Sequence, residues 1–225
     1  MGLKQTVGWQ LAPRLNDLAP GLTGGFLREA LNRAIDGVGP LAPAAAAADK
    51  QLREQRGDVE RAIHEVIENN VRLAGAQGFA TNVGGLVTMA VTIPANVAGL
   101  AIVQCRLVAG IAHLRGHDLT DPRVRNAVLT TLLGEEQVHE LVRKRKLPGT
   151  PMAIATAPVH DPALDATVSS VVATDLIARM AGKRLATSVG RQVPVIGGVV
   201  GMGADGYWTW RIGRYADREL LPRRH

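Results

Sequence analysis

Polar side chains interrupt segments of the chain that are otherwise apolar, and they are the first residues to consider for chemistry. We expect buried helices at these segments, and the polar members are Thr88, Asn96, Gln104, Arg106, Asp205, Thr209 and Arg211. A buried polar group needs a hydrogen-bond partner, and a buried arginine needs an anion. Asp205 is the only acid in the apolar half of the last segment, so we predict that it pairs with Arg106. Such a network either joins helices or lines a ligand pocket, and the sequence leaves both interpretations open.

Basic residues are the second group that could do chemistry. They form two clusters, and we expect both to contact a membrane surface: Arg143, Lys144, Arg145 and Lys146 in the first, and Arg214, Arg218, Arg223 and Arg224 in the second. A formal net charge of +6 and a pI of about 10.1 suit an anionic partner. Aromatic residues make up only 3% of the chain, which makes nucleic acid an unlikely partner because single strands are usually held by base stacking. Either cluster can equally be a solvated helix end.

Motifs for metals and nucleophiles are incomplete. His113 and His117 have the spacing of two metal ligands on one helix face, but Gly116 is expected to end the helix between them. Cys105 lies in an apolar helix and is predicted to be a buried structural thiol. We therefore expect no metal site and no cofactor. A single cysteine also rules out an internal disulfide, which fits a reducing compartment.

Two further patterns resemble known sites without completing them. Gly201–Gly206 reads G-x-G-x-x-G, but a dinucleotide-binding fold needs a second strand and an acid about 20 residues later, and too little chain remains. Glu136 and His139 match half of a di-iron motif, which needs a second copy and further carboxylates. We predict close-packing glycines at the first pattern and a solvated helix face at the second.

The elements that position these residues are predicted to be helices. Apolar residues recur at helical spacing, and residues suited to capping bound several of the segments. No pattern of strands joined by hairpin turns is found. The predicted fold is all-α, a single bundle-like domain of about six to eight helices with Gly/Ala-rich buried helices. The predicted helices cover residues 58–77, 79–93, 94–115, 121–133, 135–146, 163–189 and 196–221.

The first 48 residues look different from the rest. Prolines and glycines punctuate residues 1–48, which we predict to be a loosely structured N-terminal segment, and residues 37–48 (GVGPLAPAAAAA) are predicted to be a Pro/Ala linker. One amphipathic piece, residues 25–36, places four apolar side chains on one face: Phe26, Ala30, Leu31 and Ala34. The helical domain is expected over residues 49–225. The N-terminus lacks the apolar run of a secretory signal, so we expect a cytoplasmic protein.

A long charge-free segment raises the question of membrane insertion. Residues 73–105 contain no charged residue, roughly 33 positions, whereas a membrane span needs about 20 apolar residues. Pro94 divides the segment, and Gln104 and Arg106 interrupt its second half. We expect two buried helices packed as a hairpin, with peripheral contact to the membrane.

Three stretches resemble the EcsC family of bacterial proteins. They are residues 78–106 (GFATNVGGLVTMAVTIPANVAGLAIVQCR), 111–134 (IAHLRGHDLTDPRVRNAVLTTLLG) and 193–216 (VPVIGGVVGMGADGYWTWRIGRYA), and everything from residue 50 onward is consistent with them. The family takes its name from the third product of a bacterial operon that also encodes an ABC transporter. The resemblance implies a fold, a bacterial origin and a possible transporter partner, and it transfers no catalytic residues.

These features predict a non-enzymatic, membrane-associated helical protein. It would be an accessory to an ABC transporter or a lipid-binding protein, placed in the cytoplasm or on the inner face of the membrane. The alternative is an enzyme of unknown reaction whose centre is Arg106 with Asp205. The sequence leaves the substrate and the oligomeric state open.

Overall fold

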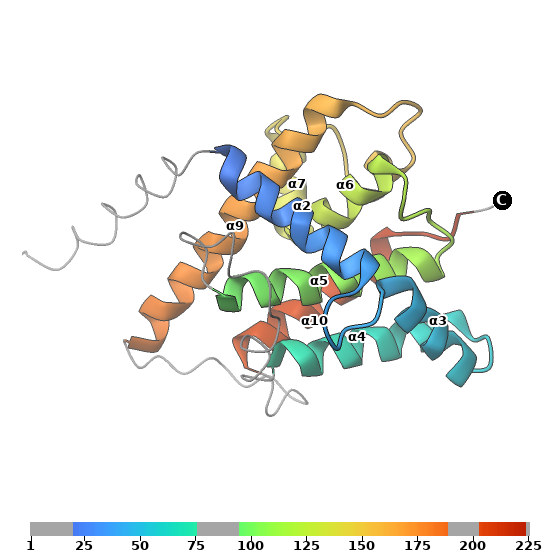
Figure 1. The fold of residues 1–225 in the computed structure, drawn as a ribbon. Helices are drawn as coiled ribbons and strands as arrows, with labels where there is room; N and C mark the ends of the chain where they lie inside the picture. The colour runs from blue at the N-terminus through green and yellow to red at the C-terminus, as the bar shows by residue number, and fades with distance from the viewer. Residues whose placement is uncertain (1–19, 76–94, 189–202, 224–225) are drawn as a thin grey trace, which may run out of the picture.

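The protein is described by a computed structural model, which covers residues 20–75, 95–188 and 203–223. These residues form an all-α fold (Figure 1), and their only strand-like pairing is an isolated bridge between Val38 and Leu41. The predicted fold class is therefore confirmed. The helices are α2 (Pro20–Asp36), α3 (Ala44–Glu54), α4 (Val59–Gly75), α5 (Ala95–Leu114), α6 (Pro122–Thr131), α7 (Glu135–Arg143), α8 (Pro151–Ala155), α9 (Pro162–Ser188) and α10 (Ala204–Glu219).

Helix α5 is the centre of the fold. Six helices pack against it, namely α2, α3, α4, α6, α9 and α10, and Figure 1 shows it running between α2 and the pair α4 and α10. Its apolar side chains face all directions, which is the pattern of a helix buried on every side. Within the part of the chain that the structure describes, Val97–Leu114 is the one helical window apolar and long enough to cross a membrane, and 78% of it is buried in the protein.

The helix ends follow from local sequence. The Asp58 carboxylate accepts a hydrogen bond from the backbone N–H of Arg61 at 3.0 Å, and Asp121 accepts one from the N–H of Arg123 at 2.8 Å. These carboxylates cap α4 and α6, because they satisfy N–H groups that have no partner within the helix. Gly116 has a φ of +80°, a backbone conformation that favours glycine, and it follows the end of α5.

The prediction of a loose N-terminal segment is wrong for residues 20–48. Helix α2 lies along α5 and α9, and the apolar face predicted within it is buried as expected, with Ala30 and Leu31 at 0% exposure. Helix α3 begins at Ala44, inside the predicted linker. Alanine has the highest helix propensity, so a run of alanines after Pro43 starts a helix as soon as one face can be buried. Ala44 and Ala48 provide that face.

Small residues let the helices approach closely around α5. A Cβ atom on Gly213 of α10 would lie 3.0 Å from Ile67 in α4 and 3.2 Å from Leu107 in α5. A Cβ atom on Gly110 would lie 3.3 Å from Val66. These contacts bring α10 and α4 onto α5 at a distance that larger side chains would prevent. The predicted helix over residues 79–93 lies outside the described residues, as do the first two residues of the glycine pattern.

Candidate functional site

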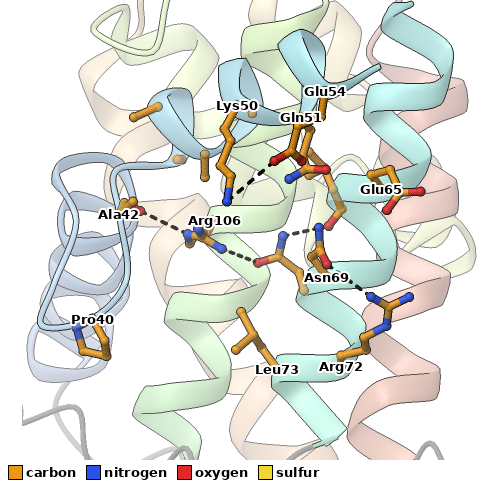
Figure 2. Close-up of a pocket in the computed structure, with 16 residues that line it drawn as sticks. Pro40, Ala42, Lys50, Gln51, Glu54, Glu65, Asn69, Arg72, Leu73 and Arg106 are labelled. Carbon is orange, nitrogen blue, oxygen red and sulfur yellow. Dashed lines mark hydrogen bonds and ion pairs between the residues drawn. The ribbon is translucent and has the colours of Figure 1, made fainter. Parts of the chain in front are cut away.

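Arg106 lies at the floor of a cavity between α3 and α4, which we call the α3–α4 cavity. Its volume is about 730 Å³. Alanines of residues 42–48 form one wall, and α4 forms the other with Val66, Asn70 and Leu73 (Figure 2). Arg106 reaches the cavity from α5, so three helices build the site.

Neutral acceptors hold the guanidinium of Arg106. Its Nε donates to the carbonyl oxygen of Ala42 at 3.1 Å, and its Nη1 donates to Oδ1 of Asn70 at 3.2 Å. Asn70 is 3% exposed and is itself fixed by a 2.8 Å hydrogen bond from its Nδ2 to the carbonyl oxygen of Val66. Among the described residues no carboxylate lies within ion-pair distance of Arg106. Burial therefore lowers the pKa of Arg106 without an acid to offset the effect.

The predicted pair of Arg106 with Asp205 is wrong: the two residues form no ion pair. Gln104 faces α10, where its Nε2 donates to Oγ1 of Thr209 at 3.3 Å. Arg106 follows two residues later, roughly 200° further around the helix, and so points away from α10. Asp205 lies in the first turn of α10.

The remaining residues of the predicted polar network lie in different parts of the structure. Gln104 and Thr209 meet, at 2% and 0% exposure, and Oε1 of Gln104 is buried without a hydrogen-bond partner among the described residues. Arg211 lies on the outer side of α10, where it pairs with Glu136 at 2.9 Å. Thr88 lies outside the described residues, and so does the side chain of Asn96.

A second cavity, of about 510 Å³, lies between α7, α9 and α10. Trp208 lies between two guanidinium groups here, with Arg179 at 5.0 Å and Arg211 at 5.1 Å from its ring centroid. Within the described part of the chain, the buried Tyr215 hydroxyl has no hydrogen-bond partner, and burial raises the pKa of Tyr215. This site could not be predicted from the sequence, because Arg179 and Trp208 come from separate helices and share no motif.

Carboxylates balance the arginines of this second cavity. Arg179 pairs with Asp175 at 2.6 Å, and Arg218 pairs with Glu135 at 2.5 Å. Burial raises the pKa of Asp175 despite the nearby Arg179. Glu135 and Glu136 of α7 pair with arginines of α10, and Asp175 pairs with Arg179 within α9, so the cavity is lined by an ion-pair network with little net attraction for an anion.

The two predicted basic clusters differ in their surroundings. Arg143, Lys144, Arg145 and Lys146 are all exposed at the C-terminal end of α7, and of these Lys144 pairs with Glu140. In the second cluster, Arg214 lies 3.6 Å from Asp217 and Arg218 pairs with Glu135. Arg223 is partly buried, and Arg224 lies outside the described residues. The first cluster therefore keeps more of its charge exposed to solvent.

Arg115 joins three helices at the far end of α5. Its side chain is 9% exposed and binds Glu60 of α4 at 2.5 Å and Asp217 of α10 at 2.8 Å. These carboxylates raise the pKa of Arg115 against the opposing effect of burial. The position of Arg115, in the turn that ends the most apolar helix, could have indicated an ion-pair site. Nothing in the sequence indicates which carboxylates bind it.

The histidine and cysteine candidates have structural surroundings. His113 Nε2 lies 2.8 Å from Oδ1 of Asp49, whereas His117 Nε2 lies 3.0 Å from the carbonyl oxygen of Leu221, so the two histidines have different partners. No three His, Cys, Asp or Glu side chains within the described ranges are grouped to hold a metal ion. Cys105 is 0% exposed as predicted, and burial raises the pKa of its thiol to about 12.

Comparisons with known proteins identify one similarity. The model of the EcsC protein family matches residues 44–224, from the first residue of α3 to beyond the end of α10. No curated protein and no solved structure matches the chain. The match covers the second cavity, both basic clusters and all of the α3–α4 cavity except Pro40 and Ala42, and it leaves α2 outside.

Proposed function

The chain belongs to the EcsC family, and from this membership and its surface charge we propose that it binds anionic membrane surfaces peripherally, from the cytoplasmic side. The observation that carries the proposal is the run Arg143–Lys146, four successive exposed cations at one helix end. Each basic residue near an anionic bilayer contributes about 1 kcal/mol of attraction. We propose a binding role and no enzymatic one, because the predicted centre of Arg106 with Asp205 does not form.

The burial of α5 supports peripheral contact over insertion. This helix has the length and composition of a membrane span, but most of it is packed inside the protein. Insertion would have to remove it from six neighbouring helices. A surface contact through exposed cations leaves the fold intact. Peripheral binding would also place the chain beside membrane proteins, and an ABC transporter, implied by the operon of the family, is the partner we propose.

Vesicle co-sedimentation tests the proposal. The full chain is mixed with vesicles of phosphatidylcholine alone, or of phosphatidylcholine with phosphatidylglycerol, at low and at high salt. We expect binding to the anionic vesicles only, and release at high salt, because salt screens exposed charges. Retention of the protein after high salt and carbonate washing would show insertion and contradict the proposal.

The chain offers a matched control for this experiment. Arg143 lies in the last turn of α7 and is followed by Arg145 with a φ of 55°, while Arg53 lies in the last turn of α3 and is followed by Arg56 with a φ of 55°. The double variants R143E/R145E and R53E/R56E therefore change the same charge at the C-terminal ends of two helices. We expect only R143E/R145E to lose vesicle binding. Equal losses would mean that net charge, and not this surface, attracts the protein.

A further inference from the structure

We propose that the α3–α4 cavity is a binding site for an oxyanion, a phosphate or carboxylate group carried by a small ligand, with the guanidinium of Arg106 as its anchor. This site is separate from the membrane surface proposed above, because Arg106 and the cations at the end of α7 belong to different parts of the molecule.

The first argument is the missing counter-charge. A partly buried guanidinium without a carboxylate loses hydration and gains no ion pair in return. Arg115 and Arg179 each have an acid within 2.8 Å, whereas Arg106 has only neutral acceptors. Arg125 is also held by neutral acceptors, the Leu119 carbonyl and the Asn32 amide oxygen, but it does not line the α3–α4 cavity. An oxyanion bound in the cavity would supply the charge that the described residues do not.

The second argument is the geometry of the free donors. A guanidinium carries five N–H donors, and Ala42 and Asn70 accept from two of them. Asn70 is buried and held by Val66, so it fixes the plane of the guanidinium. The remaining donors include both N–H groups of Nη2. Adjacent donors in one plane match the two oxygens of a carboxylate or phosphate.

The third argument is the composition of the cavity. Its volume of about 730 Å³ falls within the usual range for small-ligand sites, roughly 300–1,000 Å³. Figure 2 shows Lys50 reaching from α3 toward Arg106, while the carboxylate of Glu65 points away from it. Lys50 lies 3.7 Å from Glu54, and Arg72 pairs with Glu68 at the opposite rim. The alanine wall offers an apolar surface on which the rest of a ligand can lie.

Calorimetric titration of the full chain tests the site with three probes. These are inorganic phosphate, hexyl phosphate and the uncharged hexanol. We expect at least one of the two phosphate compounds to bind saturably, with one molecule per chain, and we expect hexanol not to bind. Equal affinity for both phosphates would identify a free anion as the ligand source, and a preference for hexyl phosphate would identify an anionic head on an apolar body. Absence of saturable binding by either phosphate would overturn the proposal.

Variants locate the bound anion. Arg106→Gln should lower the affinity about tenfold or more, because a charged hydrogen bond is lost. Ala47→Phe fills the cavity while leaving Arg106 in place, and should also abolish binding, which keeps the test decisive if Arg106→Gln fails to fold. Arg53→Gln, on α3 but outside the cavity lining, should bind as the wild type does. Unchanged affinity in Ala47→Phe would overturn the proposal. R143E/R145E should retain the binding, which separates this site from the membrane surface.

Discussion

At the scale of single residues, three arginines differ in the groups that their guanidinium contacts. Arg115 meets two carboxylates, Arg179 meets one carboxylate and an aromatic ring, and Arg106 meets only neutral oxygens. Each lies beside an apolar segment, and their sequence surroundings do not distinguish them. The difference comes from residues far away in the chain, such as Asp217, which is 102 positions from Arg115.

The two carboxylates on Arg115 give a matched comparison of ion pairs. Asp217 has a side chain 17% exposed, whereas that of Glu60 is 69% exposed. We expect Asp217→Asn to lower the free energy of unfolding by about 1–3 kcal/mol, because a charged hydrogen bond is lost in a poorly hydrated place. Glu60→Gln should cost less than about 1 kcal/mol. Urea denaturation measures both values, and equal costs would contradict the role given to burial.

His117 predicts an acid-sensitive stability. Its Nε2 donates a hydrogen bond to the carbonyl oxygen of Leu221, so a second proton would go to Nδ1, which is buried and has no partner among the residues that the structure describes. Burial accordingly lowers the pKa of His117 below its ordinary value of about 6.5. The unfolded chain then binds the proton more readily than the folded protein. The free energy of unfolding therefore falls as the pH drops from about 6.5 toward the pKa of the folded protein, and above about pH 6.5 it does not depend on this group.

Replacing the histidine tests this dependence. We expect the urea midpoint of the wild type to fall between pH 7.5 and pH 5.5, and His117→Asn to show a smaller fall over the same interval. The comparison is made within each variant, so a general loss of stability in His117→Asn does not affect it. Parallel falls in the two proteins would show that other groups cause the acid sensitivity.

At the scale of helices, the sequence predicted those elements whose ends are set by local contacts. The caps of α4 and α6 use side chains within three residues of the helix start, so they could be read from the sequence. Helix α3 was missed because its alanine run carries no apolar periodicity, and only the contact with α5 shows which face is buried. The cavity at Arg106 was missed for a related reason, since Ala42 and Asn70 are 64 and 36 positions from it.

Close packing of α10 can be tested at its glycine. A methyl group at Gly213 would meet Ile67 at 3.0 Å and Leu107 at 3.2 Å, both branched side chains of the core. We expect Gly213→Ala to lower the free energy of unfolding by about 1–3 kcal/mol through overpacking. Gly25, which lies inside α2 with open space around its Cα, is the control, and Gly25→Ala should stabilise by roughly 0.5–1 kcal/mol. Stabilisation by both changes in a thermal melt would show that α10 can shift away from α4.

At the scale of the whole molecule, the family match and the folded core have different boundaries. The match begins at Ala44, yet α2 precedes it and contributes buried side chains to the same core as α5 and α9. Leu31 of α2 and Leu129 of α6 are both 0% exposed. The folded core therefore extends beyond the residues that the family model matches.

Truncating these two leucines tests that statement. Leu31→Ala and Leu129→Ala should each lower the free energy of unfolding by about 2–5 kcal/mol, the cost of emptying a closely packed site. One residue lies outside the family match and the other inside it, so similar costs show a single cooperative core. A cost below about 1 kcal/mol for Leu31→Ala, measured by urea denaturation, would mean that α2 is only loosely attached.

The central position of α5 also affects how the protein is made. During synthesis Leu114 leaves the ribosome well before α10, which begins at Ala204 and covers one side of α5. At ordinary translation rates this interval of about 90 residues lasts on the order of 5–20 s. For that time the most apolar helix of the chain lacks part of its cover, and it has the length that the membrane-insertion machinery selects. Until α10 has been synthesised, α5 can therefore either insert into the membrane or stay in the folding protein. Chaperones that bind the nascent chain early would favour folding.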